Sequence, residues 1–327
     1  MSFLYNNFLS DFFMTCINGI NSLVNDYALC IVIITILIRL CLLPLDMKQR
    51  NNAAKMSSLG PEIQSLQKRY ANNPQQLQRK QQELYRKMNV KPMLGCLPAV
   101  IQLPILFAFF GAMQVLASQQ TVALVLDAAQ YGAQSVQLPE FFWVHNFWQP
   151  DNGMANILPN AQEFLAFVQR NTTYIPPQTL ALLHSQGLLD FSSGVMQVST
   201  DAYTTLTNQI LASNGFVDAQ GVVTNYNGYF ILPALSGVAL FLQQKFNPAS
   251  MNGGMGMGAN PEQAEAQGCS TKMMLWIFPI FSVYICATSN TAFALYWFTS
   301  SLYAFAQMKL VDFIKKARAR KKQITVS

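Results

Sequence analysis

The stretch Ile31-Val-Ile-Ile-Thr-Ile-Leu-Ile-Arg39-Leu-Cys-Leu-Leu-Pro-Leu45 decides the fold of this chain. It belongs to an apolar run, 27–45, with about the ~20 residues that cross the hydrocarbon core of a bilayer. Arg39 inside such a run costs ~2.5–3.5 kcal/mol on insertion scales. A simple lipid anchor does not need that charge, so Arg39 is a candidate functional residue. The alternative is that its side chain snorkels to the cytoplasmic headgroups.

The composition indicates a membrane protein. The chain has 327 residues, of which 51% are hydrophobic and 11% are charged, against about 25% charged in soluble globular proteins. Its six cysteines and two histidines have no metal-ligand spacing and form no CxxC motif. The spans contain no Ser/His/Asp set and no phosphate loop. We therefore expect no enzyme activity, no cofactor and no metal.

The hydropathy predicts an all-α protein with five membrane spans. Residues 1–26 are expected outside the cell as an interfacial amphipathic helix, because apolar residues recur at helical spacing over 3–24; the alternative is a helix packed on protein alone. The short turn Ser289-Asn290 makes the last two spans an antiparallel hairpin. The predicted spans are 27–45, 93–117, 229–244, 273–288 and 291–308.

The charges set the direction of the spans. The loop 46–92 has ten basic residues and three acids, and the tail 309–327 has seven basic residues and one acid. The region 118–228 has seven acids and one base, and 245–272, expected to be a flexible cytoplasmic loop, has equal charges. The positive-inside rule then places the N-terminus outside and the C-terminus in the cytoplasm.

Both loops show helical patterns. In 46–92 the turn at Asn72-Asn73-Pro74 separates two arms with a narrow apolar seam, which predicts a cytoplasmic coiled-coil hairpin; two solvated helices that do not pair are the alternative. Gly60-Pro61 interrupts the first arm. The seam residues are Met56, Leu59, Ile63, Leu66, Tyr70, Leu77, Leu84 and Met88.

The region 118–228 is predicted to be a mostly helical extracellular insertion. Short helical patterns occupy 119–130, 161–170, 177–189 and 200–212. The aromatic residues of 141–148 suit the outer membrane interface. A small hydrophobic core within the loop is an equally good interpretation.

These residues together resemble the YidC/Oxa/Alb family of membrane-protein insertases. The resemblance covers roughly 27–117 and 229–312. It rests on motifs in a specific order: Ile33-Ile-Thr-Ile-Leu-Ile-Arg39 with Pro44-Leu45, Ala54-Lys-Met-Ser-Ser-Leu-Gly-Pro61, Gly95-Cys-Leu-Pro98 with Gln102-Leu-Pro104, Ile231-Leu-Pro233 with Phe241-Leu-Gln243, and Leu295-Tyr296-Trp297.

The chain departs from the family pattern in four respects. The family commonly has Pro-Ser/Ala-Gly at the last turn, where this chain has Asn290-Thr-Ala292, and a Ser-Asn pair where this chain has Ser300-Ser301. The insertion 118–228 is longer than in compact members. The large amino-terminal periplasmic domain of Gram-negative members has no counterpart here, so the chain resembles the Gram-positive-type members.

The resemblance implies five spans around a hydrophilic groove that opens to the cytoplasm and to lipid. Arg39 would lie about 9 Å below the cytoplasmic boundary, at ~1.5 Å per residue. The groove would be lined by Arg39, Gln102, Gln243, Tyr296 and Trp297. The implied function is a membrane-protein insertase and chaperone of the bacterial plasma membrane, which works alone or with the Sec translocon.

The implied partners are nascent membrane proteins and membrane lipids, with the ribosome, the signal-recognition machinery and the Sec translocon as further candidates, and no DNA. A polytopic transporter or channel with Arg39 in the substrate path is the main alternative, because it also needs polar groups at membrane depth. Transporters usually show internal repeats and paired broken helices, and this sequence shows neither. A structural anchor for the acidic region would leave Arg39 and Gln102 unexplained.

Overall fold

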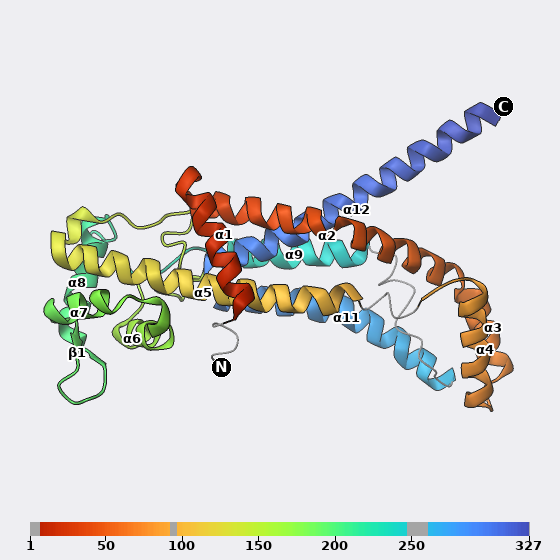
Figure 1. Ribbon diagram of the computed structural model, residues 1–327, viewed down its shortest axis with the longest axis horizontal. Coiled ribbons are helices and arrows are strands. Elements are labelled where there is room, and N and C mark those ends of the chain that lie inside the picture. Colours follow the sequence, from red (N-terminus) through yellow and green to blue (C-terminus); the bar gives the residue numbers. More distant parts are fainter. Residues whose placement is uncertain (1–6, 92–96, 247–260, 327) are drawn as a thin grey trace. The chain divides into compact units, whose positions relative to one another are not determined.

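A computed structural model describes residues 7–91, 97–246 and 261–326, and it is helical over most of them (Figure 1). Its contacts divide the chain into two compact units. Unit 1 comprises Met1–Ile31, Ile105–Ala234 and Tyr284–Tyr296, and unit 2 comprises Val32–Pro104, Leu235–Val283 and Trp297–Ser327.

The predicted spans lie on long helices. These are α2 (Tyr27–Ser58), α5 (Leu97–Tyr131), α9 (Ile231–Lys245), α11 (Pro261–Thr288) and α12 (Thr291–Val326). Within the described residues, two helices, Tyr27–Ser58 and Ile101–Tyr131, are long and apolar enough to cross a membrane. Phe8–Val24 and Leu275–Thr288 are shorter apolar helices. The count of five spans therefore stays a prediction.

The structure extends one expectation about these helices and corrects another. The helical pattern at 119–130 is confirmed, and it lies within α5, which runs through it without a break. The loop 245–272 is not wholly flexible, because α11 begins at Pro261; residues 261–267 are rich in Glu, Gln and Ala, which favour a helix. Residues 247–260 and 92–96, and so part of the loop and of the second span, lie outside the described residues.

Helix α1 (Phe8–Val24) belongs to unit 1 and packs on α5 along one face. The Ser10 hydroxyl donates to the Ala108 carbonyl over 2.9 Å, and the rings of Phe13 and Phe109 lie 5.5 Å apart. Another face leaves Phe8 84% and Leu23 88% exposed. The helix thus combines protein packing with a free apolar face. Residues 3–6 of the predicted helix lie outside the described part of the chain.

The predicted hairpin forms two helices of unit 2, α3 (Gly60–Arg69) and α4 (Pro74–Lys87), which contact each other. Asn73 caps α4 by accepting from the Gln76 amide, and Pro74 occupies its first turn, as the sequence predicts. Leu59 and Leu77 are buried, whereas Met88 is 45% exposed, so its place in the seam was wrong. Val90 is buried instead. The coiled-coil seam stays a prediction.

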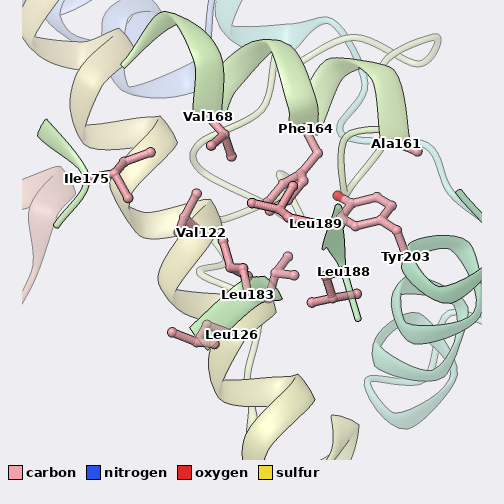
Figure 2. Close-up of a cluster of buried hydrophobic side chains, with 11 residues drawn as sticks. Val122, Leu126, Ala161, Phe164, Val168, Ile175, Leu183, Leu188, Leu189 and Tyr203 are labelled. Atoms are coloured by element: carbon pink, nitrogen blue, oxygen red, sulfur yellow. The ribbon is translucent and has the colours of Figure 1, made fainter. Parts of the chain in front are cut away.

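The insertion 118–228 folds around its own core in unit 1. Helices α6 (Ala161–Arg170), α7 (Pro177–Ser185) and α8 (Thr200–Ser213) fall on the predicted patterns. Figure 2 shows side chains from α5, α6 and α7 converging with Tyr203 of α8. The Tyr203 hydroxyl donates to the Pro159 carbonyl over 2.9 Å, and burial raises the pKa of this tyrosine.

Two strands correct the all-α prediction. β1 (Leu189–Asp190) pairs antiparallel with β2 (Gln197–Val198), with Leu189 opposite Val198. The helix expected over 177–189 therefore ends early. Gly187 has a φ of +73°, a conformation that glycine adopts without steric cost and that terminates a helix.

Gly237 marks the close approach of α9 to α11 within unit 2. A Cβ at this position would lie 2.4 Å from Cγ2 of Val283, too close for van der Waals contact. Four residues on, the Phe241 and Trp276 rings pack at 4.9 Å. A glycine therefore lets the two helices meet here.

We expect Gly237→Ala to lower the free energy of unfolding by about 1–3 kcal/mol, because the added methyl group overpacks the contact. The measurement is unfolding by sodium dodecyl sulfate in mixed micelles. Adding Val283→Ala should recover part of the loss. The control is Gly19→Ala in α1, where no atom lies within 4 Å of the new Cβ. Equal effects of the two alanine substitutions would contradict this account.

Candidate functional site

Arg39 lies on α2 in unit 2 and is partly buried. Its Nε donates to the Ser300 hydroxyl of α12 over 2.9 Å, and its Nη2 donates to the same oxygen. Ser300 is 5% exposed. A neutral hydroxyl thus orients the guanidinium and leaves its positive charge in place.

The contact between α2 and α12 continues beyond Arg39 as a polar stripe. Asp46 and Arg50 follow Arg39 at spacings of seven and four residues, which places all three on one face of a helix with 3.6 residues per turn. Asp46 interacts electrostatically with both arginines. Arg50 Nη2 donates to the Ala304 carbonyl, one turn beyond Ser300, over 3.3 Å.

The other predicted site residues divide between the units. Gln102 on α5, Gln243 on α9 and Trp297 on α12 belong to unit 2 with Arg39, and all three are partly buried. Trp297 Nε1 donates to the Ser282 hydroxyl of α11 over 2.6 Å. The convergence of the glutamines on Arg39 stays a prediction.

Tyr296 belongs to unit 1 and is only 2% exposed. Its ring stacks on Phe109 of α5, with the centroids 4.0 Å apart and the planes at 19°. Tyr296 therefore contributes to the packing of α12 on α5. Its role in a substrate path remains a prediction.

A segment that begins within the predicted aromatic cluster gathers helix ends in unit 1. Residues 146–152, called here the clamp, contact the start of α12 and the end of α11. The Gln149 carbonyl accepts from the Thr291 amide over 3.0 Å and from its hydroxyl over 2.7 Å. Asn152 Nδ2 donates to the Ala287 carbonyl over 2.6 Å. Helix ends leave backbone groups unpaired, and the clamp pairs several of them.

Asp151 is the centre of the clamp and is 0% exposed. Its Oδ1 accepts from the amides of Tyr229 and Phe230 at 2.9 and 3.1 Å. Its Oδ2 accepts from the Leu232 amide at 2.7 Å and from Trp143 Nε1 at 2.9 Å. The carboxylate therefore caps the N-terminus of α9, where the helix dipole favours negative charge.

The aromatic residues of 141–148 divide between the two sequence interpretations. Phe147 and Trp148 are 4% and 3% exposed, and the Trp148 ring meets Tyr27 of α2 edge-on at 5.1 Å. Phe142, in contrast, is 85% exposed. Phe147 and Trp148 therefore belong to a small hydrophobic core, whereas the Phe142 side chain is exposed on the surface.

The turn Ser289-Asn290 joins α11 to α12, as the sequence predicts. Asn290 Oδ1 accepts from the Phe293 amide at 3.0 Å, and its Nδ2 donates to the Met113 carbonyl of α5 at 3.0 Å. Asparagine is a favoured N-cap residue. The departure from the family's turn pattern thus supplies a cap and a link to α5.

Sequence reasoning named Arg39 from the cost of its charge and noted Ser300 as a departure from the family pattern, but it did not pair the two residues, and it missed Asp151 and the clamp. The partners of Arg39 and Asp151 lie 261 and about 80 residues away along the chain. Two features of the sequence could have pointed to these residues. Ser300 lies one helical turn after Tyr296, and Asp151 follows the aromatic residues of 141–148.

The structure has long apolar helices, and one of them holds the partly buried Arg39 against the Ser300 hydroxyl. These features are typical of a helical membrane protein. A family model described as "60Kd inner membrane protein" matches residues 19–318. The chain belongs to this family.

Similar proteins carry the name "Membrane protein insertase YidC". One from Fusobacterium nucleatum is 43% identical over 114 residues, 35% of this chain and 55% of that protein. One from Clostridium perfringens is 40% identical over 125 residues, 38% of this chain and 45% of that protein. One from Francisella tularensis subsp. novicida is 25% identical over 305 residues, 93% of this chain. The match covers 36% of that third protein, so this chain spans about half or less of the relatives it matches.

We expect Asp151→Asn to lower the free energy of unfolding by roughly 3 kcal/mol, because an amide can accept from only one of the two N–H pairs and turns its NH2 group toward the other. The measurement is resistance to unfolding in mixed detergent micelles.

Two variants make this prediction specific. Trp143→Phe removes one of the four donors and should cost about 1–2 kcal/mol. Asp201→Asn changes an exposed acid in the first turn of α8 and should cost less than about 1 kcal/mol, the contribution of the helix dipole. The capping role of Asp151 is refuted if its variant is as stable as that of Asp201.

Proposed function

We propose that this protein is a membrane-protein insertase, in which Arg39 attracts the hydrophilic tails of nascent membrane proteins. The observation that carries the proposal is a guanidinium inside an apolar helix, held by Ser300 through two N–H groups. The relatives named as insertases support the same reaction.

The proposal includes the bacterial plasma membrane as the location, with five spans. The N-terminus and residues 118–228 would lie outside, and the loop 46–92 and the C-terminal tail in the cytoplasm. The charge distribution supports this topology, because both strongly basic segments then lie on the same side.

In the proposed mechanism, an acidic substrate tail enters a hydrophilic groove from the cytoplasm and is drawn to Arg39. Gln102, Gln243, Trp297 and its neighbour Tyr296 would supply polar or amphipathic surface in the groove. Polar partners reduce the cost of removing the tail from water. The hydrophobic segment of the substrate would then partition into lipid, and burial of its apolar surface would drive the step together with the membrane potential.

Ser300 has a defined part in this proposal. Arginine paired with a carboxylate would already be neutralised, whereas a hydroxyl orients the guanidinium and leaves its charge for an incoming acid. Asp46 lies farther along the same face of α2 and interacts with Arg39 electrostatically. The stripe would thus offer the substrate one oriented positive charge.

The proposed partners are nascent membrane proteins and lipids, together with the ribosome, the signal-recognition machinery and the Sec translocon. The cytoplasmic candidates for these contacts are the hairpin α3–α4 and the C-terminal part of α12, which stays helical to Val326. Basic segments beside a span also bind anionic lipids, so ribosome binding would be an additional role.

We expect Arg39→Ala to lower insertion of a single-span substrate with an acidic tail about tenfold, equivalent to ~1.4 kcal/mol. The assay is protease protection of the radiolabelled substrate in proteoliposomes that contain only the purified protein. Arg39→Lys keeps the charge and should lose less. Insertion of the acidic-tailed substrate by Arg39→Ala at the wild-type rate would exclude the charge mechanism. Absence of any protected substrate with the wild-type protein would favour a transporter or channel.

A second prediction concerns Ser300. Ser300→Ala removes the acceptor and should slow insertion of the acidic-tailed substrate about threefold, because Arg39 is no longer oriented, whereas Ser300→Thr keeps a hydroxyl and should retain activity. A substrate with an uncharged tail is the matched control and should be inserted equally by all three proteins. Equal losses with both tails would mean that Ser300 serves only helix packing.

A further inference from the structure

Two phenylalanines of unit 1 occupy backbone conformations that bulky residues rarely adopt. Phe142 has a φ of +50° and Phe230 a φ of +65°. Glycine or asparagine would adopt these conformations with less steric cost. Both rings are nevertheless turned outward, with Phe142 85% and Phe230 43% exposed. The chain thus accepts strained backbone at two places where it presents an aromatic ring to the surroundings.

Phe142 is held at the tip of a tight turn. The Phe141 amide donates to the Val144 carbonyl over 2.8 Å, and the Val144 amide donates back to the Phe141 carbonyl over 2.9 Å. Only Phe142 and Trp143 lie between them. Phe142 contacts the rings of both Phe141 and Trp143 and still leaves most of its surface uncovered. The turn therefore projects this ring.

One buried carboxylate connects the two strained positions. Asp151 accepts from Trp143 Nε1, next to Phe142, and from the amide of Phe230. It also accepts from the amide of Tyr229, whose side chain is 58% exposed. The three exposed aromatic residues, Phe142, Tyr229 and Phe230, are thus fixed from one point, and we call them the aromatic rim.

The rim lies where an apolar helix begins. Helix α9 starts at Ile231, directly after Phe230, and Ile231, Leu235 and Val238 are 38%, 39% and 55% exposed along one face. Their spacing of four and three residues forms a continuous apolar stripe. Tyrosine is typical of the boundary between headgroups and acyl chains, and phenylalanine is among the residues that interfacial segments bury at this boundary.

We propose that the aromatic rim inserts into the outer leaflet of the membrane at the headgroup–acyl boundary, and that Asp151 fixes its geometry. The inference rests on the proposed topology, in which α9 enters the membrane from the outside. Strain at Phe142 and Phe230 is maintained because the rings must face lipid, and strained backbone of this kind persists where the surrounding structure fixes it. The partner is lipid, not a second protein.

The test places the photoreactive residue p-benzoyl-phenylalanine at position 142 of the full chain. The protein is reconstituted into vesicles of phosphatidylethanolamine and phosphatidylglycerol and irradiated, and adducts are identified by mass spectrometry of the peptides. Position 195 is the matched control, because Val195 is 61% exposed but lies in the turn between β1 and β2. Position 238 on α9 reports whether that helix faces lipid.

We expect lipid adducts at 142 and 238 at least fivefold above those at 195. Lipid adducts at 238 without lipid adducts at 142 would refute the insertion of the aromatic rim into lipid, but they would not contradict the proposed topology of α9. Equal adducts at 142 and 195, or a protein adduct at 142, would also refute that insertion. Insertion activity of the same vesicles shows that the labelled protein is folded, and loss of that activity in the unlabelled protein would count against the proposed function alone.

Discussion

The hydrogen bonds to the buried carboxylate of Asp151 are the contacts on which unit 1 depends. A charge removed from water is tolerated only when its lone pairs are satisfied, and here each oxygen accepts two N–H groups. These four hydrogen bonds fix the position of Asp151 relative to the turn at Trp143 and to the start of α9. Gly228 shows how tight this arrangement is, because a Cβ there would lie 2.1 Å from Asp151 Oδ1. The rest of the clamp then joins the ends of α11 and α12 to the same segment.

The partly buried charge of unit 2, Arg39, has a different kind of partner. Asp151 is surrounded by donors, whereas Arg39 has a neutral hydroxyl as its acceptor and an acid only farther along the same helix. A fully paired charge stabilises a fold, but it has little attraction left for a ligand. An oriented and incompletely neutralised charge can still attract one. The structure therefore holds Asp151 through four N–H donors and Arg39 through one neutral hydroxyl.

The corrections to the sequence predictions share a cause. The predicted second span ends at residue 117, whereas α5 runs on to Tyr131, because a helix continues as long as its residues favour helical backbone. The helix at 177–189 ended early because Gly187 adopts a positive φ. Met88 was expected in the seam from spacing alone, but the chain turns at Asn89, whose φ is +51°, and Val90 is buried instead. Periodicity locates helices well, whereas their ends depend on local backbone geometry.

The sequence by itself determined the helical class, the apolar segments, the family and the place of Arg39 inside an apolar run, because hydropathy, charge and helical period are local properties. It also located α6 and the Asn73 cap. Only the tertiary structure decided which groups pair. Ser300 lies 261 residues from Arg39, and Asp151 lies 78 residues from Tyr229. Such contacts arise when packing brings distant backbone together, and the need to satisfy buried polar groups then selects the partners.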